Sequence, residues 1–168
     1  MIEKFNGIIY LVVFIIHFIG YGFYAYKCVF ATQSFLDQNG VDKTGAIMTR
    51  FFGAFFIGSV LMALYIMFVR DGGVNGTWGF FNLIFMQNLC AFIVGIYTIK
   101  INKLGHTEKT SNEGIIAPGI LTVLMAILCY GLADKIYMLF KKILFGLKPR
   151  FKRFGYSTWI LGFYTTSY

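Results

Sequence analysis

The sequence predicts an all-α integral membrane protein, a bundle of four transmembrane helices followed by a basic, aromatic C-terminal segment. Of the 168 residues, 58% are hydrophobic and only 13% are charged, whereas a soluble domain usually carries about 25% charged residues. A chain this short forms one modest core, which cannot hide so much apolar surface. Four long apolar runs each match the roughly 20 residues that a helix needs to cross a bilayer.

The four predicted spans are residues 7–30, 51–69, 78–99 and 115–132. Each run is continuous, whereas the strands of a membrane barrel alternate polar and apolar residues over about 10 positions, so helices are predicted. The first run is longer than a signal-peptide core and has no small-residue cleavage site, which predicts a retained helix.

Short polar connections join the spans, at residues 32–49, 71–77 and 100–113. The first contains a Gln38-Asn39-Gly40 turn signal, and the second is rich in Gly and Asn, as tight turns are. None is long enough to fold alone. We therefore predict one transmembrane domain, residues 1–134, and a separate amphipathic tail, residues 135–168.

The tail combines positive charge with aromatic side chains. Seven of the 15 basic residues lie between Lys135 and Arg153, and Pro149 ends any helix there. Basic clusters beside a span attract anionic lipid headgroups, and lysines on an interfacial helix reach toward the headgroup layer. The residues predicted to lie at the membrane surface are Lys141, Lys142, Lys148, Arg150, Lys152 and Arg153. The alternative is a solvated or partner-bound extension.

The formal net charge of +8 also bears on whether the protein binds nucleic acid and on how it is oriented in the membrane. Nucleic acid is not a predicted partner, because the charge flanks a span and no nucleic-acid-binding motif is present.

The basic residues give conflicting signals about the orientation of the chain in the membrane. An even number of spans places both termini on one side, where Lys4, Arg70 and the tail outnumber the basic residues opposite. Without the tail the bias reverses, toward Lys27, Lys43, Arg50, Lys100, Lys103 and Lys109. Since the tail begins directly at a span end, we expect both termini in the cytoplasm.

Polar and small residues inside the spans are the candidate packing or ligand-facing positions. Polar groups at membrane depth face the bundle or a cavity. In the third span such residues share about one third of the helix circumference, and small residues there let another backbone approach. The second span has a similar small-residue pair. The candidates are Ala54, Gly58, Gln87, Asn88, Ala91 and Gly95.

His17 is the one histidine inside a predicted span. A buried imidazole can hydrogen-bond to a neighbour, relay protons or ligate a metal-containing group. A haem held by two histidines would need a second at similar depth, and His106 lies in a connection. We predict an interior hydrogen-bonding role and no cofactor, with a pigment or a haem shared with another subunit as the alternative.

No catalytic constellation is visible. Cys28, Cys90 and Cys129 are isolated, so the paired dithiol of an oxidoreductase and a structural zinc site are both disfavoured. These cysteines are predicted to pack as small apolar side chains. No Asp or Glu lies in the middle of a predicted span, where an ion-coupled carrier usually needs one. The sequence therefore predicts a protein that is not an enzyme.

The stretch Arg50-Phe-Phe-Gly53-Ala54-Phe-Phe-Ile-Gly58 resembles the start of the second helix in small four-span membrane proteins of the DoxX-like kind. The likeness in layout extends over about residues 5–133 and leaves out the tail. It implies a four-helix bundle, and it implies no activity, because most members of that group have none assigned.

Taken together, these patterns favour a non-enzymatic membrane subunit or accessory protein. Its small-residue faces would pack against other membrane chains or a second copy, and its tail would bind the bilayer surface. The alternative is a binder or carrier of a small hydrophobic ligand, such as a lipid, quinone or pigment, held near His17, Gln87 and Asn88 within the bundle.

Overall fold

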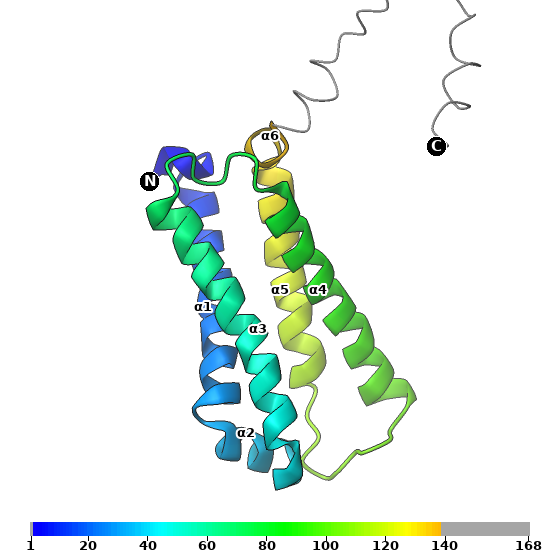
Figure 1. The fold of residues 1–168 in the computed structure, drawn as a ribbon. Coiled ribbons are helices and arrows are strands. Elements are labelled where there is room, and N and C mark those ends of the chain that lie inside the picture. Colours follow the sequence, from blue (N-terminus) through cyan, green and yellow to red (C-terminus); the bar gives the residue numbers. More distant parts are fainter. Residues whose placement is uncertain (1, 139–168) are drawn as a thin grey trace, which may run out of the picture.

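Four long apolar helices form the body of the molecule and confirm the predicted fold class (Figure 1). The computed structural model of the chain describes residues 2–138, and within that range it contains helices and connections but no strand. The long helices are α1 (Ile8–Val29), α3 (Ala46–Leu64), α4 (Trp78–Ile96) and α5 (Glu113–Gly131). The predicted membrane-surface residues Lys141 to Arg153 lie outside the described residues.

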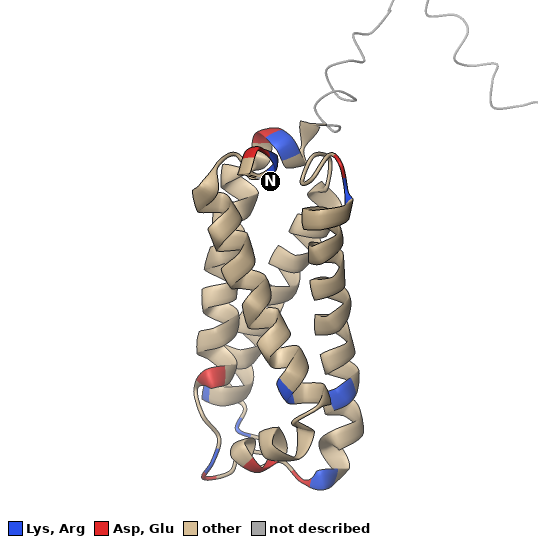
Figure 2. Cartoon of the chain, turned by 90° about the vertical axis from the view of Figure 1, so that its left-hand side faces the viewer, with Lys and Arg blue, Asp and Glu red and all other residues tan. Residues whose placement is uncertain are grey.

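Shorter elements lie at the two ends of the bundle. One end holds η1 (Ile2–Phe5), the 70–77 connection and α6 (Ala133–Ile136), and the other holds α2 (Thr32–Asn39), η2 (Lys43–Gly45) and the 102–112 connection. Charged residues gather at these two ends, with an uncharged band of helix between them (Figure 2). That distribution fits helices that cross a hydrocarbon layer.

The helix boundaries differ most from the predicted spans at the start of the second span, and by one or two residues at the end of the third and the start of the fourth. The second long helix begins at Ala46 rather than at Phe51, and α2 occupies part of the predicted 32–49 connection. The apolar run begins only at Phe51, but the chain is already helical before it. The short helix η2 begins after Asp42, whose carboxylate accepts a hydrogen bond from the Thr44 amide at 2.8 Å, and η2 leads directly into α3. The predicted turn is present: Gly40 ends α2 with a φ of 65°, a left-handed conformation that favours glycine.

Both middle helices continue into a single π-helical turn. α3 is followed by η3 (Tyr65–Val69), and α4 is followed by η4 (Tyr97–Ile101). These turns lengthen the two apolar helical segments to Val69 and Ile101. The sequence pattern did not separate them from ordinary α-helix, because a π turn of this kind changes the hydrogen-bond register without changing hydrophobicity.

The bundle is built from two helix pairs. α1 packs along α3, α4 packs along α5, and α1 also contacts α5 between the pairs. Aromatic side chains fill much of the interior, and Phe5, Phe14 and Phe81 are essentially inaccessible. Between 11% and 33% of each span is buried within the chain. The apolar remainder is exposed on the outer faces of the helices, which is consistent with a lipid environment.

Glycines bring the paired helices together. A side chain at Gly53 would collide with Val29 and Cys28 of α1, and one at Gly95 would collide with the backbone carbonyl of Gly114. Close backbone approach at small residues is the usual packing device of membrane helices. Gly53 therefore belongs to the α1–α3 interface and Gly95 to the α4–α5 interface.

Candidate functional site

A buried hydrogen-bonded group joins the two helix pairs at the centre of the bundle. Asn88 of α4 accepts a hydrogen bond from the Tyr21 hydroxyl at 2.7 Å, and its amide nitrogen lies 3.0 Å from His17 Nε2. The His17 ring stacks on the Tyr21 ring with centroids 4.9 Å apart. All three side chains are buried. The Asn88 amide thus gives a hydrogen-bond partner to both the Tyr21 hydroxyl and His17 Nε2, which would otherwise be unsatisfied in hydrocarbon.

His17 is held through one nitrogen and has no partner at the other. Its ring is fully inaccessible, and within the described residues Nδ1 makes no hydrogen bond. His106 lies in the 102–112 connection, outside the bundle interior, where its Nε2 is 3.0 Å from the Thr98 carbonyl oxygen. No three His, Cys, Asp or Glu side chains come together as a metal site within residues 2–138.

Two cavities lie beside Asn88. The first, of about 160 Å³, reaches from Asn88 toward the end of the bundle that holds α2. The second, of about 370 Å³, lies among α1, α3 and α4. Phe56, Asn88 and Ala91 line both, so the two cavities adjoin. α3 packs closely against α1, and α4 packs closely against α5. Since α3 and α4 do not pack closely against each other, this space is left between them.

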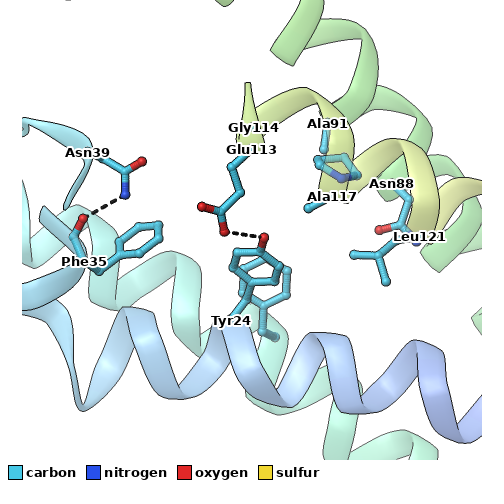
Figure 3. A pocket seen from close by; sticks show the side chains of 11 residues that line it. Tyr24, Phe35, Asn39, Asn88, Ala91, Glu113, Gly114, Ala117 and Leu121 are labelled. Atoms are coloured by element: carbon cyan, nitrogen blue, oxygen red, sulfur yellow. Dashed lines mark hydrogen bonds between the residues drawn. The ribbon is translucent and has the colours of Figure 1, made fainter. Parts of the chain in front are cut away.

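The first cavity is mainly apolar, with Tyr24, Asn39 and Glu113 toward the α2 end and Asn88 at the other (Figure 3). Its lining residues come from α1, α2, α3, α4 and α5: Tyr24, Phe35, Asn39, Phe56, Asn88, Ala91, Glu113, Gly114, Ala117, Pro118 and Leu121. Figure 3 shows the Glu113 carboxylate directed toward Tyr24, whose hydroxyl donates to Glu113 Oε1 at 2.8 Å. Lys27 Nζ lies 3.9 Å from the same oxygen.

The predicted site residues fall into three groups. His17, Asn88 and Gly95 are buried inside the bundle. Gln87 and Ala91 are exposed on α4 but line the cavities beside Asn88. Ala54 and Gly58 face outward from α3, and nothing lies within 4 Å of a side chain built at Gly58.

The cysteines do not all behave as predicted. Cys28 is buried and Cys129 is partly buried, but Cys90 is exposed and lines the second cavity. The prediction of a packed side chain is wrong for Cys90, because α3 does not cover that face of α4. All three thiols are free.

Sequence reasoning missed Glu113, Tyr24 and Phe35 as cavity residues. The sequence pattern places Glu113 in a connection because it precedes the apolar run, yet it is the first residue of α5. The pattern also places Phe35 in a connection, although it lies on α2. A sign available in the sequence was the single acidic residue directly before an apolar run, which often marks the first turn of a helix.

Comparison with protein-family models, with curated proteins and with solved structures found no match to this chain. The resemblance to the DoxX-like proteins therefore stays a prediction that rests on residues 50–58.

Proposed function

We propose that this protein binds a small amphipathic molecule, of the lipid, quinone or pigment kind, between its two helix pairs. The observation that supports this most directly is the pair of adjoining cavities that share Phe56, Asn88 and Ala91. Ligand sites are typically concave and mainly apolar, with a few polar groups that fix orientation. The proposal reverses the order that the sequence alone favoured, because residue patterns could not reveal that α3 and α4 stand apart.

The size of the space is adequate for such a ligand. An apolar cavity of about 150 Å³ is enough to take a benzene molecule, and the second cavity alone has about 370 Å³. Most residues that line the two cavities belong to the four apolar helices, so a hydrophobic molecule would be supplied from the bilayer. Asn88, which lines both, offers the polar contact nearest the centre.

An Ala91→Phe variant tests this proposal. Ala91 lines both cavities, so a phenyl ring there fills the space that the ligand needs. The matched control is Ala54→Phe, the same exchange at an exposed position on α3. Native mass spectrometry of protein extracted in a mild maltoside detergent should show a bound small molecule on wild type and Ala54→Phe, and little on Ala91→Phe.

Two outcomes contradict the proposal. One is wild-type protein that carries no small molecule after gentle extraction and takes up none from added lipid extract. The other is equal occupancy in Ala91→Phe and Ala54→Phe.

A second candidate is the accessory-subunit function, for which the outward face of Ala54 and Gly58 is the supporting observation. This small-residue pair is uncovered in the single chain, and such pairs let a second membrane helix approach closely. Replacing Gly58 by Leu should then release any chain that co-purifies from native membranes. A monomer that brings no other chain with it would count against this candidate.

We further propose that both termini face the cytoplasm. The end of the bundle that holds η1 also holds α6, after which the basic tail begins. A cysteine-free variant with single cysteines at the 71–77 and 102–112 connections would decide this by labelling with an impermeant reagent. The proposal predicts labelling of the 102–112 connection from outside the cell.

A further inference from the structure

We propose that the cavity at the Glu113 end binds the ammonium headgroup of a single-chain amphiphile, whose tail extends toward Asn88. This inference rests on the proposed ligand-binding function and names the chemical class of the ligand. It follows from the charges, the aromatic rings and the apolar depth of one cavity.

The lining carries one ionised group, and that group is acidic. Among the described residues that line the first cavity, Glu113 is the carboxylate, and none is Lys or Arg. Its Oε1 accepts from Tyr24, while Oε2 has no hydrogen-bond partner among the described residues. A carboxylate with a free oxygen at a cavity wall favours a cation or a hydrogen-bond donor and opposes an anionic headgroup.

Aromatic rings surround the same end. Tyr24, Phe35 and Phe56 come from three different helices and all line this cavity. The faces of aromatic rings attract cations, and such rings are the common means of recognising quaternary ammonium groups. Carboxylate and rings together therefore match an organic ammonium better than a metal ion, for which too few oxygen ligands are present.

The chain already places one ammonium in this environment. Lys27 Nζ lies 3.9 Å from Glu113 Oε1, and it stands 5.9 Å from the centroid of the Phe35 ring and 4.8 Å from that of Phe23. Lys27 itself is not among the residues that line the cavity. It therefore acts as an internal competitor that approaches Glu113 from outside, at a distance typical of a weak ion pair.

The rest of the cavity suits a hydrocarbon chain. Beyond Glu113 the lining consists of Ala91, Ala117, Pro118 and Leu121, and Asn88 lies at the deep end. Figure 3 shows Glu113 and Tyr24 on one side and Asn88 with Leu121 on the other. Since Glu113 begins α5, the headgroup would lie near the membrane surface and the tail would follow the spans inward.

Binding of two matched probes tests the inference. Hexadecyltrimethylammonium and hexadecanoate have equal chain length and opposite charge, and each can be radiolabelled and titrated into the full chain in maltoside micelles. We expect wild type to bind the cation about tenfold more tightly than the anion, after subtraction of partition into empty micelles.

Two variants separate headgroup recognition from a purely structural role. Glu113→Gln keeps an acceptor for Tyr24 but removes the charge, so it should weaken cation binding about tenfold and, because the repulsion is lost, should strengthen anion binding. Lys27→Met removes the competitor and should strengthen cation binding several-fold. Both variants break the same ion pair, so a structural effect would shift them in the same direction, whereas the inference requires opposite directions.

The outcomes distinguish this inference from the proposed function. Equal or tighter binding of hexadecanoate by wild type would overturn the ammonium inference and leave ligand binding intact, as would a cation affinity that does not change in Glu113→Gln. If wild type binds neither probe above the micelle background, or if Ala91→Phe binds both as wild type does, ligand binding at this site is itself overturned.

Discussion

The interfaces within the helix pairs and the space between α3 and α4 are built from different residues. At the α4–α5 interface Gly95 and Gly114 meet backbone to backbone, and at the α1–α3 interface Gly53 leaves room for Val29 and Cys28. Between α3 and α4, by contrast, Phe52, Phe55 and Phe56 of one helix face Gln87, Cys90 and Ala91 of the other around a cavity.

This difference shows what closes a helix interface inside a membrane. Lipid tails are as apolar as the side chains, so helices associate through close packing and hydrogen bonds rather than through hydrophobic burial. Glycine permits the close approach, whereas the α3–α4 space is lined by phenylalanines on its α3 side and remains open as a cavity. The Asn88 hydrogen bonds then tie α4 to α1 across the bundle where backbone packing is absent.

The largest effect is expected at the closed interface. A methyl group at Gly95 would collide with the Gly114 carbonyl, and since backbone cannot rotate away as a side chain does, Gly95→Ala should cost about 1–3 kcal/mol. Gly79 provides the control, because it lies on the same helix and a methyl group there meets nothing within 4 Å. Denaturant unfolding in detergent measures both. Equal stability of the two variants would mean that Gly95 does not set the approach of α4 to α5.

The central hydrogen bonds should contribute less. Asn88→Leu leaves the Tyr21 hydroxyl and His17 Nε2 without their partner, and interhelical hydrogen bonds in membranes are worth about 0.6 kcal/mol on average. Two such bonds predict a loss of about 1 kcal/mol in the free energy of unfolding. Gln87→Leu removes the neighbouring amide, which is exposed, and should cost nothing measurable. A loss as large in Gln87→Leu would show that amide removal as such, not the network, is responsible.

How far could these two regions be foreseen from the sequence? The four helices could, because span length and hydropathy are properties of single segments. Asn88 and Gly95 were also identified as inward-facing, since helical periodicity relates residues on one helix. Which helices pair could not be derived, because Gly53, Ala54 and Gly58 offer similar small surfaces and only three-dimensional packing selects Gly53.

The cavity was beyond sequence reasoning for a related reason. Its polar end combines Tyr24 of α1, Phe35 of α2 and Glu113 of α5. These residues lie far apart in the chain and share no spacing pattern. Glu113 also lies where an apolar-run criterion places a connection, so its contribution to a membrane-depth cavity becomes visible only when the helix boundary is known.

Tyr21→Phe removes one hydrogen bond of the central network by itself. This change removes one hydrogen bond to Asn88 and keeps the ring that stacks on His17, so it should cost about 0.6 kcal/mol, less than Asn88→Leu. The double variant should be no less stable than Asn88→Leu alone, because the shared bond can be lost only once. Tyr26→Phe, at an exposed ring on the same helix, is the control. Strict additivity of the two costs would contradict a direct Tyr21–Asn88 bond in the protein.

The smallest effect is expected at η2, the short helix that leads into α3 and so into one wall of the cavity. The hydrogen bond from the Thr44 amide to the Asp42 side chain holds the pKa of that carboxyl below its ordinary value of 3.8. A lowered folded-state pKa means that the ionised carboxylate stabilises the fold. This contribution is complete above the ordinary pKa and is lost as the pH falls through the lowered pKa.

Asp42→Asn keeps a capping oxygen but cannot titrate. Thermal unfolding of wild type and Asp42→Asn should therefore differ slightly at neutral pH, with wild type the more stable, and the difference should shrink as the pH is taken below 3.8. A difference that stays constant across this range would show that the charge of Asp42 does not help to fix the start of η2, and that the capping geometry alone does so.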